Sequence, residues 1–442
     1  MKIAGIDIGT TTISGIVLED KKEKRPEILE TKTIQNDCFI QTGHEWERIQ
    51  DAQQILKKAE ALLDYFINKY PDIKRVGLTG QMHGIVYVDE QGKCVSPLYT
   101  WQDSRGNLCE DKLPLTEEIR EKYKIRTASG YGIVTHIYNM RHNLVPESAV
   151  SFCTIMDCFG MYLTGRKTPL MHVSNAAGIG FFDGSKMCFE TEILEKEGVH
   201  KSWLPETCME IQELGLYKNC TVTTAIGDNQ ASFLGAAGTW ENTALINMGT
   251  GGQISILSEK FFETDGIEAR PFLDGKYLLA GASLCGGKAY ALLEQFFRKF
   301  MKEAKGIEEP LYEIIEKLAW KGKELNSRQS ENRRLKIETT FDGTRTDPEI
   351  SGSVMNLFSD NFTPEYFAYG VLEGMSRELY QMYQIICQGT GIKVNRIAGA
   401  GNGLRKNPVL CEIIKEMFGA ELAVTECEEE AAFGAAMSSR RH

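Results

Sequence analysis

Two stretches of this chain share one pattern, in which a strand, a glycine-rich turn and a second strand follow one another. Apolar and polar residues alternate over residues 3–17 around Gly9-Thr10-Thr11-Thr12, and again over residues 244–256 around Gly249-Thr250-Gly251-Gly252. Alternation with a period of two predicts strands, and a glycine turn between them predicts a hairpin. A repeated unit of this kind indicates an internal duplication. We therefore expect two related lobes, the first over residues 1–222 and the second over residues 223–442.

Length and composition agree with two lobes and exclude several classes of protein. The chain has 442 residues, of which 42% are hydrophobic and 25% charged, as is typical of a large α/β enzyme. Its net charge of -11, with dispersed Lys and Arg, argues against a nucleic-acid partner. Because no apolar run is long enough to cross a bilayer and no leader pattern is evident, we expect a cytoplasmic protein with no membrane partner. The 12 cysteines lack metal-ligand spacing and are interpreted as small buried residues.

Hydrophobic periodicity places further elements along the chain. Helical spacing predicts helices over residues 46–70, 148–163, 289–300, 311–320, 367–388, 407–418 and 429–437. Short apolar runs predict strands over residues 75–78, 85–88 and 394–398, one near Leu422, and one from residue 223 that ends at Gly227 and Asp228. Strands that alternate with helices predict an α/β fold.

Three glycine turns follow predicted strands and are candidate phosphate sites. They are Gly9-Thr10-Thr11-Thr12, Gly249-Thr250-Gly251-Gly252 and Gly399-Ala400-Gly401. Phosphate oxygens need backbone N–H groups at close range, which a Cβ atom obstructs, and threonine hydroxyls add donors without negative charge. A single such turn is more often an ordinary tight hairpin, but three of them favour a nucleotide bound between two lobes. None has the spacing of a Walker-type phosphate loop.

Two aspartates occupy corresponding places in the two halves, Asp7 and Asp228. Phosphoryl transfer needs one carboxylate to accept the hydroxyl proton and another to hold hydrated Mg²⁺. An aspartate at the end of a strand is about as often a turn or capping residue. The pair therefore predicts a phosphoryl-transfer site with Asp7 and Asp228 as candidate metal ligands.

Two loops of the first half carry groups suited to a sugar. Gln81-Met82-His83-Gly84 and Trp101-Gln102-Asp103-Ser104-Arg105 combine amide, imidazole, carboxylate, guanidinium and indole side chains. Planar bidentate groups bind neighbouring hydroxyls, and an aromatic face covers the C–H side of a sugar. His83 by itself would more often be a hydrogen-bonded core histidine.

These motifs together resemble the FGGY carbohydrate kinases of the actin-like ATPase superfamily, and the resemblance extends from Ile3 to Ala436. Residues 6–11 resemble the first phosphate loop, residues 227–231 the motif of the catalytic aspartate, residues 247–250 the second phosphate loop, and residues 399–401 the adenosine loop. The resemblance implies two actin-like (ribonuclease H-like) lobes around a central cleft. Each lobe is expected to be a mixed, five-stranded sheet flanked by helices.

The resemblance also implies a role for each candidate residue. Asp228 is expected to be the general base and to contact the substrate, and Asp7 to order the Mg²⁺ shell. ATP is expected to bind at Gly9, Thr10, Thr11, Gly249, Thr250, Gly401, Asn402 and Asn407. The sugar is expected to contact Gln81, Met82, His83, Trp101, Asp103 and Arg105, and further contacts are expected within residues 139–175.

Within the family, residues 80–84 resemble the ketose kinases, and two segments resemble the sedoheptulokinase branch. These segments are Trp46-Glu47-Arg48-Ile49-Gln50-Asp51 and Thr100-Trp101-Gln102-Asp103-Ser104-Arg105. The chain departs from the branch at Ser104, Ala52 and Ala400, where glycine, proline and glycine are usual. The expected reaction is phosphorylation of sedoheptulose to its 7-phosphate. A xylulokinase, another ketose or polyol kinase, and a non-catalytic actin-like nucleotide sensor are the alternatives, in a monomer or homodimer.

Overall fold

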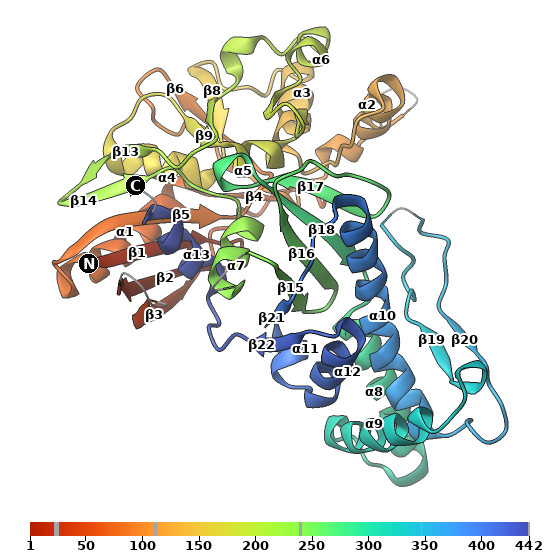
Figure 1. Ribbon diagram of the computed structural model, residues 1–442. Coiled ribbons are helices and arrows are strands. Elements are labelled where there is room, and N and C mark those ends of the chain that lie inside the picture. Colours follow the sequence, from red (N-terminus) through yellow and green to blue (C-terminus); the bar gives the residue numbers. More distant parts are fainter. Residues whose placement is uncertain (22–25, 110–112, 238–240, 346, 441–442) are drawn as a thin grey trace. The chain divides into compact units, whose positions relative to one another are not determined.

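The computed structural model describes residues 1–21, 26–109, 113–237, 241–345 and 347–440 (Figure 1). The described residues form two compact units. Unit 1 comprises Met1–Gly238, Arg270–Lys276 and Glu429–His442, and unit 2 comprises Thr239–Ala269 and Tyr277–Glu428. The division expected from the sequence, at residues 222 and 223, differs from these units: Asp228 and the C-terminal helix, assigned to the second lobe, lie in unit 1.

Unit 1 is built on a mixed sheet, which has six strands among the described residues instead of the expected five. β1 pairs antiparallel with β2 and parallel with β5, so the predicted hairpin lies at the centre of the sheet. The strands, in their spatial order, are β13 (Glu213–Tyr217), β14 (Cys220–Thr223), β5 (Ile73–Gly80), β1 (Lys2–Ile8), β2 (Thr12–Glu19) and β3 (Glu27–Gln35).

Unit 2 repeats this arrangement around the second predicted hairpin. β15 pairs antiparallel with β16 and parallel with β21, and β16 pairs antiparallel with β18. Among the described residues this sheet also has six strands, in the order β17 (Ile267–Pro271), β18 (Tyr277–Ser283), β16 (Gly252–Ser258), β15 (Thr243–Met248), β21 (Arg396–Ala400) and β22 (Glu421–Val424). The fold class expected from the sequence, two actin-like α/β lobes with mixed sheets, is confirmed.

Two helices of unit 1 pack closely on its sheet. α1 (Ala52–Lys69) covers one face, where Phe66 lies beside Gly15 of β2. α13 (Glu430–Ser439) covers the other face, where a Cβ atom on Gly77 would lie 1.7 Å from the Ala435 carbonyl oxygen. Glycine at position 77 therefore allows α13 to approach the backbone of the strands.

Short elements make up the rest of unit 1, and their bounds correct two predictions. The helix predicted over residues 46–70 begins only at Ala52, because the Asp51 side chain accepts a hydrogen bond from the Gln54 N–H and caps it. The helix predicted over residues 148–163 is a strand followed by a helix. The remaining helices and strands are β4 (Ile49–Gln50), β6 (Val86–Asp89), β7 (Leu98–Tyr99), α2 (Leu115–Tyr123), α3 (Gly132–Arg141), β8 (Ala149–Cys153), α4 (Ile155–Thr164), β9 (Leu170–His172), α5 (Val173–Ala176), β10 (Phe182–Asp183), β11 (Cys188–Phe189), α6 (Thr191–Lys196), β12 (Glu206–Cys208) and α7 (Asp228–Ala237).

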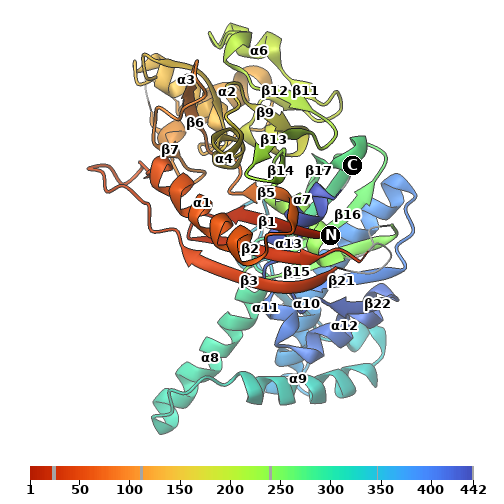
Figure 2. The same cartoon turned by 90° about the vertical axis from the view of Figure 1, so that its left-hand side faces the viewer.

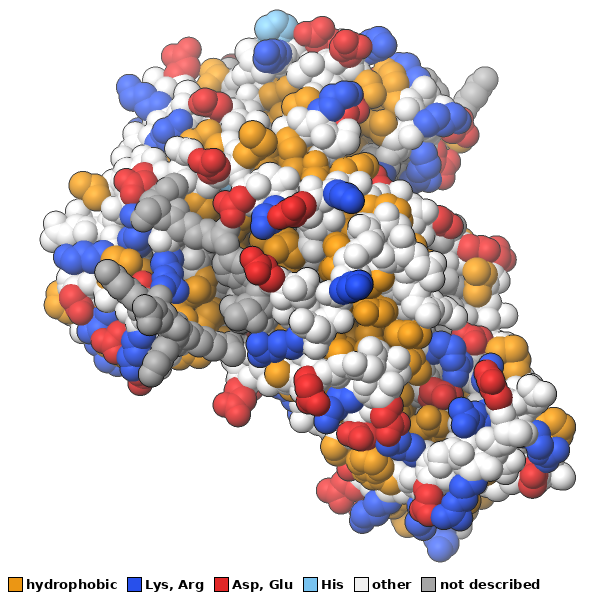
Figure 3. Space-filling view, in the orientation of Figure 1, with side chains coloured by type: hydrophobic (Ala, Val, Ile, Leu, Met, Phe, Trp, Pro, Cys, Tyr) orange, Lys and Arg blue, Asp and Glu red, His pale blue; other side chains and the backbone are white. Residues whose placement is uncertain are grey.

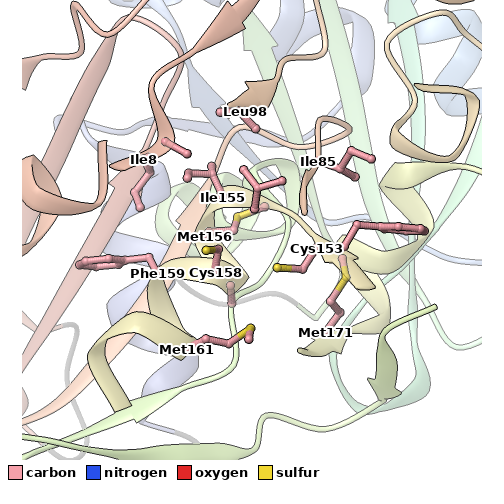
Figure 4. Close-up of a cluster of buried hydrophobic side chains, with 14 of the residues drawn as sticks. Ile8, Ile85, Leu98, Cys153, Ile155, Met156, Cys158, Phe159, Met161 and Met171 are labelled. Atoms are coloured by element: carbon pink, nitrogen blue, oxygen red, sulfur yellow. The ribbon is translucent and has the colours of Figure 1, made fainter. Parts of the chain in front are cut away.

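A hydrophobic core lies beneath the carboxyl ends of the central strands of unit 1. Figure 4 shows part of this core, where Ile155, Cys158 and Phe159 of α4 lie among Ile8 of β1 and Ile85, and all five side chains are almost fully buried. The core gives the loops that follow β1 and β5 a rigid base.

The helices of unit 2 confirm the predicted segments, and α8, α9 and α10 continue beyond the predicted ends. They are α8 (Gly287–Lys305), α9 (Tyr312–Ser327), α10 (Pro364–Thr390), α11 (Asn402–Arg405) and α12 (Pro408–Phe418), joined by the small strands β19 (Lys336–Glu338) and β20 (Ser353–Met355). No helix among the described residues combines the length and the apolar character that crossing a membrane requires. On the face shown in Figure 3, Lys and Arg are interspersed with Asp and Glu and form no basic stripe.

Candidate active site

Asp7 lies near the end of β1, on the sheet face that α13 covers. Its neighbours across the sheet are Ser14 of β2 and Thr79 of β5. Gly5, two residues earlier on the same face, lies directly against the backbone of α13. Burial, and then the negative charges of Asp228 and Glu429, raise the pKa of Asp7 to about 7.

Asp228 is the first residue of α7, which corrects the prediction that it ends a strand. β14 stops at Thr223, and an irregular segment leads into the helix. Two hydrogen bonds fix this segment: the Ile226 N–H donates to the Leu78 carbonyl at 3.0 Å, and the Gly227 N–H donates to Ser174 Oγ at 3.1 Å. These bonds hold Asp228 in place at the N-terminus of α7.

A relay of side chains holds the Asp228 carboxylate. Asn229 Nδ2 donates to Asp228 Oδ1 at 2.8 Å, and Arg270 donates to Asn229 Oδ1 at 2.8 Å. Neither Asn229 nor Arg270 was predicted from the sequence as a site residue. Asn229 adjoins the recognised motif and could have been included, whereas Arg270 comes from a distant segment without a motif of its own.

Glu429 is a further acidic residue whose charge acts on Asp7, and it was not predicted from the sequence. It immediately precedes α13, and the Thr33 hydroxyl donates to its Oε1 at 2.8 Å. The only signal in the sequence is a short run of glutamates, residues 428–430, before an Ala/Gly-rich helix. Such a run reads equally well as a solvated helix start.

The acidic group of Asp7, Asp228 and Glu429 has a chemistry that suits Mg²⁺. A carboxyl desolvated beside two other carboxylates is strongly stabilised by a divalent cation. Among the described residues, no three His, Cys, Asp or Glu side chains are close enough to bind a metal ion directly. Mg²⁺ commonly keeps several water ligands and uses one or two carboxylates, so these residues fit an ion bound largely through water. The assignment of Asp7 and Asp228 to Mg²⁺ stays a prediction.

The first predicted phosphate loop, Gly9 to Thr12, is fixed by amide side chains. Asn36 Nδ2 donates to the Gly9 carbonyl at 2.7 Å, and Gln50 Nε2 donates to the Thr10 carbonyl at 2.9 Å. Thr11 is exposed to solvent. The side chains that hold the loop leave the Thr11 hydroxyl available for a phosphate.

Thr10 and Gln81 belong to one hydrogen-bond network with Trp101. The Thr10 hydroxyl donates to Gln81 Oε1 at 3.3 Å and accepts from the Trp101 indole N–H at 3.0 Å. Gln81 Nε2 donates to Gln50 Oε1 at 2.9 Å. The structure therefore brings together Thr10, assigned to phosphate, and Gln81 and Trp101, assigned to sugar. Gln50 was quoted from its motif but given no role.

Met82 and His83 lie beside the segment that leads into Asp228. A Cβ atom on Gly227 would lie 2.8 Å from Met82 Sδ, so the two residues are in close contact. His83 Nδ1 lies 2.6 Å from the Gly178 carbonyl oxygen, which can only accept, so Nδ1 donates to it, and in the neutral ring Nε2 is then an acceptor. His83 also has a φ of 75°, a strained conformation that is common at functional sites.

Trp101 presents an aromatic surface to solvent, with 47% of its area exposed. Beside it lies an open cavity of about 640 Å³, lined by Phe39, Arg48, Trp101 and Gln102. An indole ring with a guanidinium and an amide nearby is a suitable surface for a polyhydroxylated ligand. Arg48 and Phe39 were not selected from the sequence.

Asp103 and Arg105, predicted to contact sugar, are almost completely buried and bind each other. Arg105 Nε donates to Asp103 Oδ1 at 2.7 Å, and its terminal nitrogens donate to Asp103 Oδ2 at 3.0 Å and Asn139 Oδ1 at 2.6 Å. Asp103 Oδ2 also accepts from the Arg48 backbone N–H at 3.0 Å. These contacts give the pair a positioning role beneath Trp101, and a direct sugar contact stays a prediction.

The region 139–175 contributes buried amides more than exposed ones. Asn139 accepts from Arg105, and Asn175 Nδ2 donates to Thr154 Oγ1 at 2.8 Å and Asp157 Oδ2 at 2.5 Å. Burial raises the pKa of Asp157 to about 7. Substrate contacts from this region remain untested.

Unit 2 carries the second predicted phosphate loop, Gly249 to Gly252. The N-terminus of α8 packs on it: the Gly287 N–H donates to the Gly249 carbonyl at 2.9 Å, and the Lys288 N–H donates to the Thr250 carbonyl at 3.0 Å. Gly249 and Thr250 are exposed. The loop is thus fixed through its carbonyl groups while Gly249 and Thr250 remain accessible, as phosphate binding would require.

The predicted adenosine loop lies beside this phosphate loop within unit 2. Gly401 has a φ of 86°, and a Cβ atom there would lie 2.6 Å from Asn247 Oδ1 and from the Met248 carbonyl oxygen. Glycine is therefore required both by backbone conformation and by space. Asn402 is exposed, whereas Asn407 is buried and its Oδ1 accepts from the Leu410 N–H at 3.0 Å, capping α12.

Comparisons with known proteins agree with this fold. Residues 2–238 match the N-terminal domain of the FGGY family of carbohydrate kinases, and residues 244–439 match its C-terminal domain. A sedoheptulokinase of Mus musculus is 25% identical over 98% of this chain and 96% of its own length. A xylulose kinase of Staphylococcus xylosus is 23% identical over 98% of this chain and 89% of its own length.

Solved structures give the same result for the fold. The xylulose kinase of Rhodospirillum rubrum superimposes with a TM-score of 0.81 at 18% identity, covering 100% of this chain and 89% of that one. The glycerol kinase of Plasmodium falciparum, solved with ADP, superimposes with a TM-score of 0.77 at 18% identity, covering 99% of this chain and 88% of that one. The two matched domains together span nearly the whole sequence, and the chain belongs to the FGGY family of carbohydrate kinases.

Proposed function

We propose that this carbohydrate kinase transfers the γ-phosphate of ATP to a terminal hydroxyl of a ketose, with sedoheptulose as the substrate and sedoheptulose 7-phosphate and ADP as products. The observation that carries the proposal is that, within unit 1, Asp7 lies near the charges of Asp228 and Glu429 while Met82 contacts Gly227, the residue before Asp228. This placement combines carboxylates that would bind a cation with a polar loop suited to a sugar.

Asp228 is the proposed general base. The substrate hydroxyl oxygen forms a bond to the γ-phosphorus, the bond from this phosphorus to the bridging oxygen breaks to leave ADP, and Asp228 takes the hydroxyl proton. Asn229, which donates to one oxygen of Asp228, orients the carboxylate so that its other oxygen is directed at the substrate. His83, with an accepting Nε2, would receive a hydrogen bond from a further sugar hydroxyl.

Asp7 and Asp228 would hold Mg²⁺ through water, and when bound the ion would offset the negative charge of the phosphates. Thr10, Thr11 and the Gly9 backbone would bind phosphate oxygens in unit 1, and Gly249 and Thr250 would do so in unit 2. Gly401, Asn402 and Asn407, which caps α12, would flank the adenosine. A cytoplasmic location and the state of monomer or homodimer stay predictions.

Two observations favour a seven-carbon substrate. Relatives named sedoheptulokinase cover nearly the whole chain, and residues 100–105 resemble their motif. In addition, Arg48 and Gln102 line the open cavity beside Trp101, where they would bind the extra hydroxyls of a longer sugar. Relatives named xylulose kinase keep a five-carbon ketose as the alternative.

Coupled measurement of ADP release with ATP and Mg²⁺ tests the proposal. We expect the highest kcat/KM for sedoheptulose among sedoheptulose, xylulose, ribulose, fructose and glycerol, because a site that binds each hydroxyl discriminates against sugars that lack one. Arg48→Ala should lower kcat/KM for sedoheptulose by about tenfold and leave that for xylulose within about twofold. If the wild type prefers another ketose, that ketose is the substrate instead of sedoheptulose. If none of the sugars increases ADP release, the result favours a nucleotide sensor.

A further inference from the structure

His172 ends strand β9 and takes part in a buried chain of hydrogen bonds in unit 1. β9 pairs in parallel with β12 (Figure 2), with His172 opposite Cys208, and the Met209 carbonyl that follows β12 lies 2.9 Å from His172 Nε2. At the other ring nitrogen, Ser174 Oγ lies 2.7 Å from His172 Nδ1. His172 is 0% exposed and Ser174 1% exposed, so both side chains are shielded from solvent.

The direction of each hydrogen bond in this chain follows from its partners. The Met209 carbonyl can only accept, so His172 Nε2 donates to it. Burial lowers the pKa of His172 to about 4, so near neutral pH the ring is neutral and Nδ1 is an acceptor. Nδ1 therefore accepts from the Ser174 hydroxyl, and also from the Ser174 backbone N–H at 3.2 Å. Because its proton is used in this way, Ser174 Oγ accepts from the Gly227 N–H, at 3.1 Å.

The segment that contains Ser174 also holds the other residue proposed to act on the sugar. Gly227 immediately precedes Asp228, so Ser174 fixes the backbone from which the proposed base extends. Four residues after Ser174, the Gly178 carbonyl accepts from His83 Nδ1 at 2.6 Å. The backbone between Ser174 and Gly178 is helical throughout. One continuous piece of helical backbone thus contacts both His83 and the residue before Asp228.

We propose that His172 and Ser174 are positioning residues for phosphoryl transfer: His172 orients the Ser174 hydroxyl, which holds Asp228 at the separation from His83 that the reaction needs. The proposal rests on the proposed function, in which Asp228 is the base and His83 binds sugar. A purely structural role would be to cap the start of α5, where His172 accepts the Ser174 N–H. Capping uses neither the Ser174 hydroxyl nor a partner next to Asp228, whereas positioning needs both.

A second contact of the same type, between His200 and Ser202, provides a matched control. His200 Nδ1 lies 2.9 Å from Ser202 Oγ and accepts from the Ser202 N–H at 3.2 Å, and both residues are exposed. Ser174→Ala should lower kcat by about 10- to 100-fold in the coupled ADP assay, since a displacement of about 1 Å at reacting groups has effects of this order. The KM values should stay within about twofold, because Gly178 still holds His83. Ser202→Ala should leave kcat unchanged.

Two substitutions of His172 test which of its hydrogen bonds matters. Asn places Oδ1 where His has Nδ1, so His172→Asn keeps the acceptor for Ser174 and loses the donor to Met209. Gln places its amide nitrogen where His has Nε2, so His172→Gln keeps the donor and loses the acceptor. We expect His172→Gln to lower kcat as Ser174→Ala does, and His172→Asn to recover most of the kcat that His172→Gln loses. Equal losses in the two variants would overturn the proposal.

A double variant with Asp228→Asn tests whether Ser174 acts through the base. If it does, adding Ser174→Ala to Asp228→Asn should lower the residual kcat by less than about twofold, whereas the effects of independent changes multiply. Amide hydrogen exchange of residues 224–230 does not depend on activity, and it should be faster in Ser174→Ala than in wild type or Ser202→Ala.

Two results would overturn the positioning role while leaving the proposed function intact. They are multiplying effects in the double variant, and a kcat of Ser174→Ala within about twofold of wild type. If the wild type shows no sugar-dependent ADP release, the proposed function fails and this role fails with it, and faster exchange in Ser174→Ala would then report a structural contact only.

Discussion

The substitution Asp7→Asn should stabilise the protein and inactivate it. The pKa of Asp7 is raised from 3.8 to about 7, chiefly by burial. One pKa unit corresponds to about 1.4 kcal/mol, so ionising Asp7 at pH 8 opposes folding by on the order of 4 kcal/mol. Asn has nearly the same shape and does not ionise, so the substitution removes this unfavourable contribution to folding. The same change removes a proposed Mg²⁺ ligand.

The pH window of this effect follows from the direction of the shift. Between about pH 4 and pH 7 the unfolded chain has lost the Asp7 proton while the folded chain retains it. Stability due to this group therefore falls as pH rises, by up to about 1.4 kcal/mol per pH unit, and levels off above pH 7. Below about pH 4 both states are protonated, and the substitution should have little effect on stability.

Urea denaturation of wild type and Asp7→Asn, in Mg²⁺-free buffer from pH 4 to pH 8, measures the difference. We expect the difference in the free energy of unfolding to grow toward about 4 kcal/mol at pH 8. We also expect this difference to become smaller when Mg²⁺ is added. Asp157→Asn is a matched control, since burial also raises the pKa of Asp157 to about 7 away from the acidic group. It should show the pH dependence without the response to Mg²⁺. Equal differences at pH 5 and pH 8 would refute the reasoning.

Three other substitutions test the site and its support. Asp228→Asn should lower kcat by about 10² to 10⁴-fold and change the KM values little, in the coupled ADP assay, because it removes the proposed base; activity within tenfold of wild type would exclude that role. Trp101→Ala should raise the KM for sugar more than the KM for ATP in steady-state kinetics, and the reverse order would contradict a sugar contact. Gly77→Ala should reduce the free energy of unfolding by about 1 to 3 kcal/mol in urea, because its Cβ would lie 1.7 Å from the Ala435 carbonyl oxygen, and an unchanged midpoint would show that α13 is not so close.

Local patterns in the sequence predicted much of this fold. The two hairpins at residues 3–17 and 244–256 are central in both sheets, because alternation and a glycine turn are properties of adjacent residues. The predicted ends of helices and strands were less accurate where a capping residue determines them. Asp51 starts α1 later than hydrophobic spacing suggested, and Asp228 begins a helix instead of ending a strand. Periodicity does not distinguish such a start from a continuing element.

The site depends on contacts between segments that are far apart in the sequence. Glu429 lies near Asp7 because α13, at the end of the chain, packs on glycines of β1 and β5 in unit 1. Arg270 returns to unit 1 from the middle of the second half. Asp103 and Arg105 were predicted to bind sugar because of their side-chain chemistry. In the structure both are buried and hydrogen-bonded to each other. None of these contacts has a local signature.

The most direct test of the central claim is ³¹P NMR of the product formed from ATP and sedoheptulose by the wild type and by Asp228→Asn. We expect the wild type to form a phosphomonoester whose signal is split into a triplet by the two protons of a terminal CH₂ group, in equal amount to ADP. Asp228→Asn should form almost none in the same time. Inorganic phosphate as the only product, or equal ester formation by the variant, would contradict the account.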